Sequence, residues 1–80
     1  MTRAERMAER RAREAWIAVR VFAKLAAKRQ VQAQIRANGE RLSDYSNREI
    51  TIRSEQWLVQ HPELVVEARA KAAALGYAPL

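Results

Sequence analysis

Residues 2–39 read TRAERMAERRAREAWIAVRVFAKLAAKRQVQAQIRANG, and this stretch decides the fold. Before its final glycine it contains neither glycine nor proline, and it is rich in alanine, arginine, glutamate, lysine and glutamine, which are strong helix formers. Thr2 suits the N-cap position, with Glu5 completing a capping box, and Asn38-Gly39 is a helix stop signal. The stretch therefore predicts one helix of roughly 35 residues, about 50 Å long.

Two shorter helices are predicted downstream of this long one. Ser46 as N-cap and Glu49 three residues later form a second capping box, which starts a helix running from about Asn47 to Gln60. Pro62 suits the first position of a third helix, since its missing N–H would have no intrahelical partner there. That helix ends at Gly76, a residue suited to the left-handed conformation after a helix.

The predicted fold class is all-α, with residues 1–80 forming one small domain. The two shorter helices pack against the C-terminal part of the long helix. Residues 1–14 offer little besides Met7 for packing, so they are expected to form a basic extension that frays. A short strand over residues 49–53 is the competing interpretation, because β-branched side chains alternate there, but the chain shows no partner strand.

Composition excludes several classes of protein. The chain has 80 residues, two glycines, two prolines and no cysteine, so a disulfide framework and a cysteine-ligated zinc site are impossible. No cluster has metal-ligand spacing and no glycine-rich phosphate loop occurs, so neither a metal, a cofactor nor an enzymatic activity is expected. No apolar run approaches the length of a membrane span or a signal peptide. We therefore expect a cytoplasmic protein, and the alanine and arginine usage resembles that of a bacterial or phage chain.

The positive charge is concentrated in the first half of the chain. Residues 1–40 hold ten Lys and Arg against four Glu, so they account for the whole net charge of +6. On a helical wheel, six of these cations fall within about 80° of one another with no acid between them. We call this set the basic stripe, and it comprises Arg6, Arg10, Arg13, Arg20, Lys24 and Lys28.

The basic stripe predicts a binding function. It covers about 33 Å of helix, and phosphates along a nucleic-acid backbone lie on the order of 7 Å apart, so nucleic acid, whether DNA or RNA, is the leading predicted partner. The alternative is an interaction adaptor or assembly component that docks the basic helix on an acidic protein. A solvated helix face explains the pattern without any partner. A membrane surface is disfavoured, because alanine fills much of the apolar face.

The long helix also has an unusually wide apolar side, which adjoins the basic stripe at Ile17 and predicts a homo-oligomer, in the simplest case a dimer. Trp16 lies near the boundary between the two sides. Both Trp16 and Trp57 are interpreted as core or rim side chains rather than as stacking platforms for bases. The predicted oligomer interface consists of Ile17, Val21, Phe22 and Leu25.

Overall fold

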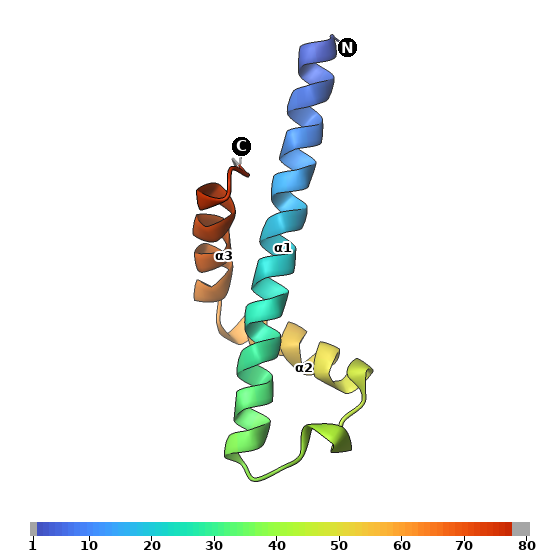
Figure 1. Ribbon diagram of the computed structural model, residues 1–80, viewed down its shortest axis with the longest axis vertical. Helices are drawn as coiled ribbons and strands as arrows, with labels where there is room; N and C mark the ends of the chain where they lie inside the picture. The colour runs from blue at the N-terminus through green and yellow to red at the C-terminus, as the bar shows by residue number, and fades with distance from the viewer. Residues whose placement is uncertain (1, 78–80) are drawn as a thin grey trace.

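The computed structural model describes residues 2–77, which form one long helix with two shorter helices packed against it (Figure 1). The order of elements is α1 (Arg3–Ala37), a short 3-10 turn η1 (Leu42–Asp44), α2 (Asn47–Gln60) and α3 (Glu63–Ala74). No strand occurs among residues 2–77, and the alternating segment 49–53 lies within α2. The all-α prediction and its three helices are confirmed.

Side-chain caps begin the first two helices as predicted. At α1 the Thr2 hydroxyl accepts a hydrogen bond from the Glu5 N–H (3.2 Å), and the Glu5 carboxylate accepts one from the Thr2 N–H (3.3 Å). At α2 the Ser46 hydroxyl accepts from the Glu49 N–H (3.2 Å), but the Glu49 carboxylate meets the Ser46 hydroxyl instead of its N–H. The first capping box is therefore complete, whereas the second has the hydrogen bond to the serine hydroxyl but not the one from the serine N–H to the glutamate.

Glycines end α1 and α3 by the same hydrogen-bonding pattern. Gly39 and Gly76 have φ angles of 78° and 93°, in the left-handed region that other residues rarely adopt. After each glycine, the next residue's N–H donates to the carbonyl five residues back, at 3.1 and 2.9 Å, which defines a Schellman motif. Pro62 is the N-cap of α3 rather than its first residue, one position from the prediction.

A single row of side chains on α1 holds both shorter helices. The buried residues of α1 recur at every fourth position, and each step of four advances about 40° around the helix. The row therefore winds around α1, facing α3 in its upper part and α2 in its lower part (Figure 1). We call this set the buried row, and it comprises Ala15, Val19, Ala23, Ala27, Val31 and Ile35.

Alanines let α3 lie close against α1. The cluster between these helices contains Val19 and Ala23 of α1 with Ala68 and Ala72 of α3, and Ala72 has no exposed surface. Three of these four residues are alanines, whose side chain is a single methyl group, so the backbones of the two helices approach closely. The lower cluster is built from larger side chains, with Val31 and Ile35 packed against Ile50 of α2. Helix α3 is thus held on one side of α1 by close contact of small side chains, and α2 is held on another side by packing of larger ones.

Enlarging an alanine between α1 and α3 is expected to destabilise the fold. Ala72→Leu adds three carbons to a side chain that has no exposed surface, and such overpacking typically costs about 1–3 kcal/mol. The melting temperature followed by circular dichroism should fall by roughly 4–20 °C. Ala70→Leu on the exposed side of α3 is the matched control and should melt within a few degrees of the wild type. Equal melting temperatures for the two variants would contradict close packing of α3 on α1 at Ala72.

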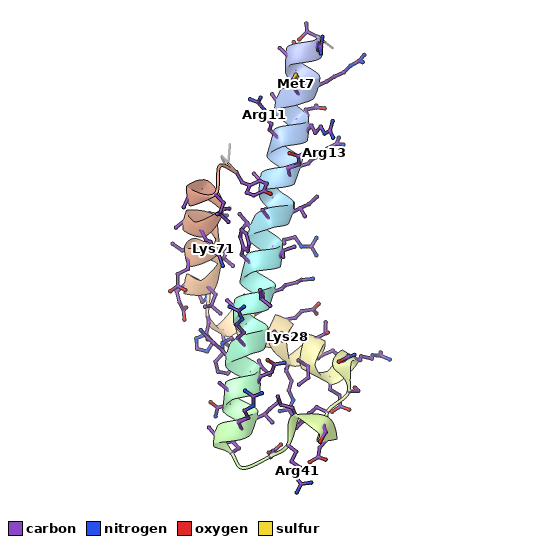
Figure 2. All side chains as sticks on the ribbon, in the orientation of Figure 1. Met7, Arg11, Arg13, Lys28, Arg41 and Lys71 are labelled. Carbon is purple, nitrogen blue, oxygen red and sulfur yellow. The ribbon has the colours of Figure 1, made fainter. Side chains whose placement is uncertain are left out.

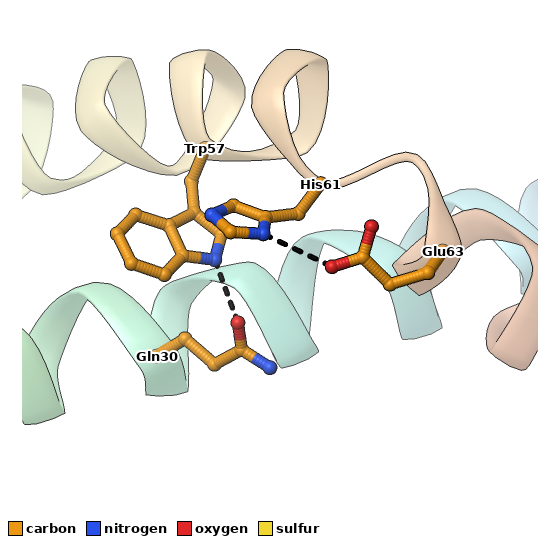
Figure 3. A network of polar contacts seen from close by, with 4 residues as sticks. All are labelled: Gln30, Trp57, His61 and Glu63. Atoms are coloured by element: carbon orange, nitrogen blue, oxygen red, sulfur yellow. Dashed lines mark hydrogen bonds and ion pairs between the residues drawn. The ribbon is translucent and has the colours of Figure 1, made fainter.

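A chain of polar contacts connects all three helices where α2 passes into α3 (Figure 3). The Trp57 indole N–H donates to the Gln30 side-chain oxygen of α1 at 2.7 Å. One face of Trp57 stacks on the His61 ring, with centroids 4.4 Å apart, and His61 Nδ1 lies 3.0 Å from the Glu63 carboxylate. A hydrogen bond from its own backbone N–H, and then His61, hold the pKa of Glu63 below its ordinary value of 4.5.

The lowered pKa of Glu63 makes stability depend on pH in a defined direction. Since this carboxyl group is more acidic in the folded chain, its contribution is fully present above pH 4.5 and is lost as the pH falls through the folded pKa. Glu63→Gln should therefore lower the urea midpoint at pH 7 and lose that effect in more acidic solution. Glu55→Gln, which removes an exposed carboxylate with no hydrogen-bond partner among residues 2–77, is the control. A Glu63→Gln deficit that persists at pH 2.5 would refute this assignment.

Candidate nucleic-acid interface

The basic stripe lies entirely on exposed surface. All six of its side chains, from Arg6 to Lys28, are solvent-exposed on α1. Figure 2 shows Arg13 on the side of α1 turned away from α3, whereas Arg11, which is not part of the stripe, points towards the side where α3 lies. The structure therefore brings the predicted residues together on one helix, and neither α2 nor α3 buries any of them.

Only one cation of the stripe is paired with an acid in the described part of the chain. Arg10 Nε lies 3.3 Å from the Glu14 carboxylate, one turn further along α1. Both side chains are largely exposed, so this pair contributes little to stability and can exchange for another anion. The other five cations make no ion pair among residues 2–77, so their charge is available to a ligand.

Besides the buried row, the middle of α1 carries three other rows of side chains, which differ in charge and exposure. One is basic, and includes Arg20, Lys24 and Lys28 one turn apart. The second contains Ile17, Val21 and Leu25 and is exposed and apolar. The third, with Phe22 at its centre, is half-buried beside α3. The basic row thus lies between the buried row and the exposed apolar row.

A small cavity opens beside the basic row where the three helices meet. It has a volume of about 230 Å³, and its lining is almost entirely apolar. Sequence reasoning missed this site, because Leu58 of α2 and Val65 of α3 complete it. The one indication of this site in the sequence is that Trp16, Arg20 and Lys24 follow one another at intervals of four residues, which places them on the same row of the helix. The full lining is Trp16, Val19, Arg20, Ala23, Lys24, Leu58 and Val65.

The predicted oligomer interface is divided between two surfaces. Ile17, Val21 and Leu25 are 58%, 54% and 40% exposed, so α2 and α3 leave this apolar row open to solvent. Phe22 is half-buried against the cluster between α1 and α3, and Lys71 lies over its ring at 4.9 Å. Phe22 therefore faces α3, and the open surface consists of the other three side chains.

The remaining surface shows little other chemistry. Within residues 2–77, no three His, Asp or Glu side chains lie close enough together to hold a metal ion. No helix in this range is both long enough and apolar enough to cross a bilayer. Comparison with protein-family models, with curated proteins and with solved structures finds no match to this chain. The basic stripe and its surroundings are therefore the surface from which a function can be inferred.

Self-association through the open apolar row is expected to strengthen with salt. A symmetric dimer presents the same surface from both copies, so each brings a basic row to the contact, and salt screens that repulsion. Sedimentation equilibrium should therefore show an association constant that rises with ionic strength. Val21→Gln should weaken association, whereas Val66→Gln, at a 66% exposed position on α3, should not. A chain that stays monomeric at every salt concentration would exclude this interface.

Proposed function

We propose that this protein binds nucleic acid through the basic stripe on α1, and that it acts by binding rather than by catalysis. One observation carries the proposal: six cations are exposed on one face of a single helix, and α2 and α3 leave that face open. Five of the six have no acidic partner among residues 2–77. A face of this kind is an electrostatic match for a phosphate backbone.

The spacing of the stripe supports this partner. Residues one turn apart, such as Lys24 and Lys28, are separated by about 6 Å along the helix axis. Neighbouring phosphates of one strand lie on the order of 7 Å apart, so successive side chains of the stripe can reach successive phosphates. Three arginines occupy the N-terminal half, and a guanidinium can donate two parallel hydrogen bonds to one phosphate.

The shape of the molecule gives a ligand unobstructed access to this face. The upper end of α1 extends past α3 with nothing packed against it (Figure 1). Residues 3–10, which we call the N-terminal arm, have only exposed side chains, including Arg6 and Arg10. A strand or duplex can therefore follow the stripe along the arm without meeting the shorter helices. Phosphate contacts of this kind carry no sequence information, so we propose weakly specific binding.

A second candidate function is favoured by the open apolar row. Ile17, Val21 and Leu25 have the basic row, including Lys24, along one flank, and Arg29 follows Leu25 at the end of the apolar row. An amphipathic helix of another protein, apolar on one face and acidic along one edge, would match this arrangement. Such docking would need the apolar row, whereas phosphate binding needs only the cations. This difference separates the two functions experimentally.

The nucleic-acid function predicts a steep dependence on salt. The slope of log K against log salt concentration should approach −5 if all six cations contact one duplex, because each contact then contributes about −0.9, and about −4 on a single strand, where each contributes about −0.7. Arg13→Gln with Arg20→Gln should reduce the slope by about two and lower affinity similarly for every sequence tested. Fluorescence anisotropy with labelled DNA and RNA measures both quantities.

The control for this double variant removes the same amount of positive charge from outside the basic stripe. Arg48→Gln with Arg69→Gln removes two exposed cations on α2 and α3 that lie outside the stripe, and it should leave the slope unchanged. Equal losses from the two double variants would mean that net charge alone drives binding. No binding to DNA or RNA at low salt would remove the nucleic-acid function. The second candidate function would then be established if the wild-type protein binds an acidic protein partner and the double variant Ile17→Gln with Val21→Gln does not.

A further inference from the structure

The two tryptophans have very different surroundings. Trp57 is half-buried, stacks on His61 and donates its indole N–H to Gln30, so its face and its polar atom are both occupied (Figure 3). Trp16 is 56% exposed and makes no hydrogen bond or ring stacking within residues 2–77. Although the sequence suggested a core or rim position for both tryptophans, Trp16 therefore has a ring face that is open to a ligand, whereas Trp57 does not.

Trp16 also lies in register with the cations of the stripe. It precedes Arg20 by one turn and Lys24 by two, so about 12 Å of helix carries an aromatic ring followed by two positive charges. All three side chains line the same 230 Å³ cavity, with Leu58 and Val65 on its far side. The cavity is smaller than the usual 300–1,000 Å³ of a site for a drug-sized ligand, so it suits a single ring system.

We infer that the ligand of the basic stripe is single-stranded nucleic acid, with one unpaired base stacked on Trp16 at this cavity and adjacent phosphates on Arg20 and Lys24. The inference rests on the proposed function and specifies its substrate class. An aromatic face combined with a cationic track is the arrangement by which proteins bind single strands without sequence preference. A base inside a duplex is covered on both faces by its neighbours, so it cannot reach the ring.

The lining of the cavity favours a base over other groups that an acidic ligand could insert. It is almost wholly apolar, so it offers a stacking surface but no hydrogen bonds that would read a base edge. Binding should therefore tolerate any base, and it should accept DNA and RNA strands alike, because ring faces and phosphates are common to both. The cations at the rim supply the attraction for the backbone, and the ring supplies the preference for an unpaired strand.

The test compares Trp16 variants on single-stranded and duplex ligands. We expect Trp16→Leu, which keeps an apolar side chain, to lower affinity for an oligothymidylate roughly 5- to 150-fold, the range for losing one stacked base. It should leave the salt slope and the affinity for a duplex of equal length unchanged, because no charge is removed. Trp16→Phe should restore most of the loss, and an oligouridylate should behave like the oligothymidylate.

A second readout is measured on the unsubstituted site. In protein labelled with 5-fluorotryptophan, the oligothymidylate should shift the fluorine resonance of Trp16 and leave that of Trp57 in place, with Trp16→Leu used for assignment. A duplex should move neither resonance. These measurements report on the ring itself and are independent of how the variants affect affinity.

The outcomes distinguish this inference from the function on which it rests. If the duplex binds as tightly as the single strand and Trp16→Leu changes neither affinity, the stripe binds phosphates and the inference is wrong. If neither ligand binds at low salt, the proposed function fails and the inference fails with it. Circular dichroism of Trp16→Leu should match the wild type, since the side chain is more than half exposed.

Discussion

The buried row of α1 is the constraint on which the rest of this structure depends, since both shorter helices pack against it and residues 2–77 contain no other continuous core. Because its members recur every four residues, the row turns around α1 as it descends, and α3 and α2 consequently lie on different sides of the long helix. What they leave uncovered follows from the same geometry. The basic row and the open apolar row are the two surfaces of the middle of α1 that α2 and α3 leave exposed, so the packing pattern determines where a ligand can approach.

Local signals in the sequence were enough to predict the helices. Thr2, Ser46, Gly39 and Gly76 mark helix ends through hydrogen bonds made by residues nearby in the chain, so their effect does not depend on tertiary structure. The strand alternative at residues 49–53 failed because capping at Ser46 and packing of Ile50 on α1 outweigh a short alternating pattern. The sequence did not predict which residues of α1 the shorter helices cover. A helical wheel places Ile17 and Leu25 on the broad apolar side, whereas the buried cluster with α3 contains Val19 and three alanines, which let the helices come close.

The candidate site was predictable only in its charged part. Cations on a helix without acids between them remain exposed in any packing, because burying an unpaired charge is very costly, and all six are exposed. The cavity beside Trp16 depends on Leu58 and Val65, which are more than 40 residues away in the chain. No periodicity within the long helix specifies which residues of α2 and α3 come to lie against it. The aromatic ring was therefore visible in the sequence, but the space next to it was not.

The N-terminal arm has a consequence for the energetics of binding. Its turns are held by helical hydrogen bonds and a terminal cap, with no side chain buried against another element, so they can unwind without disturbing the core. Amide hydrogens in the arm should accordingly exchange with solvent far faster than those near Ala27. A ligand that grips Arg6 and Arg10 must hold these turns in helical form, and part of its interaction free energy is then spent on lost conformational entropy. The affinity for a ligand therefore depends on the helix stability of the arm. At an exposed arm position that does not contact the ligand, alanine should raise the affinity and glycine should lower it.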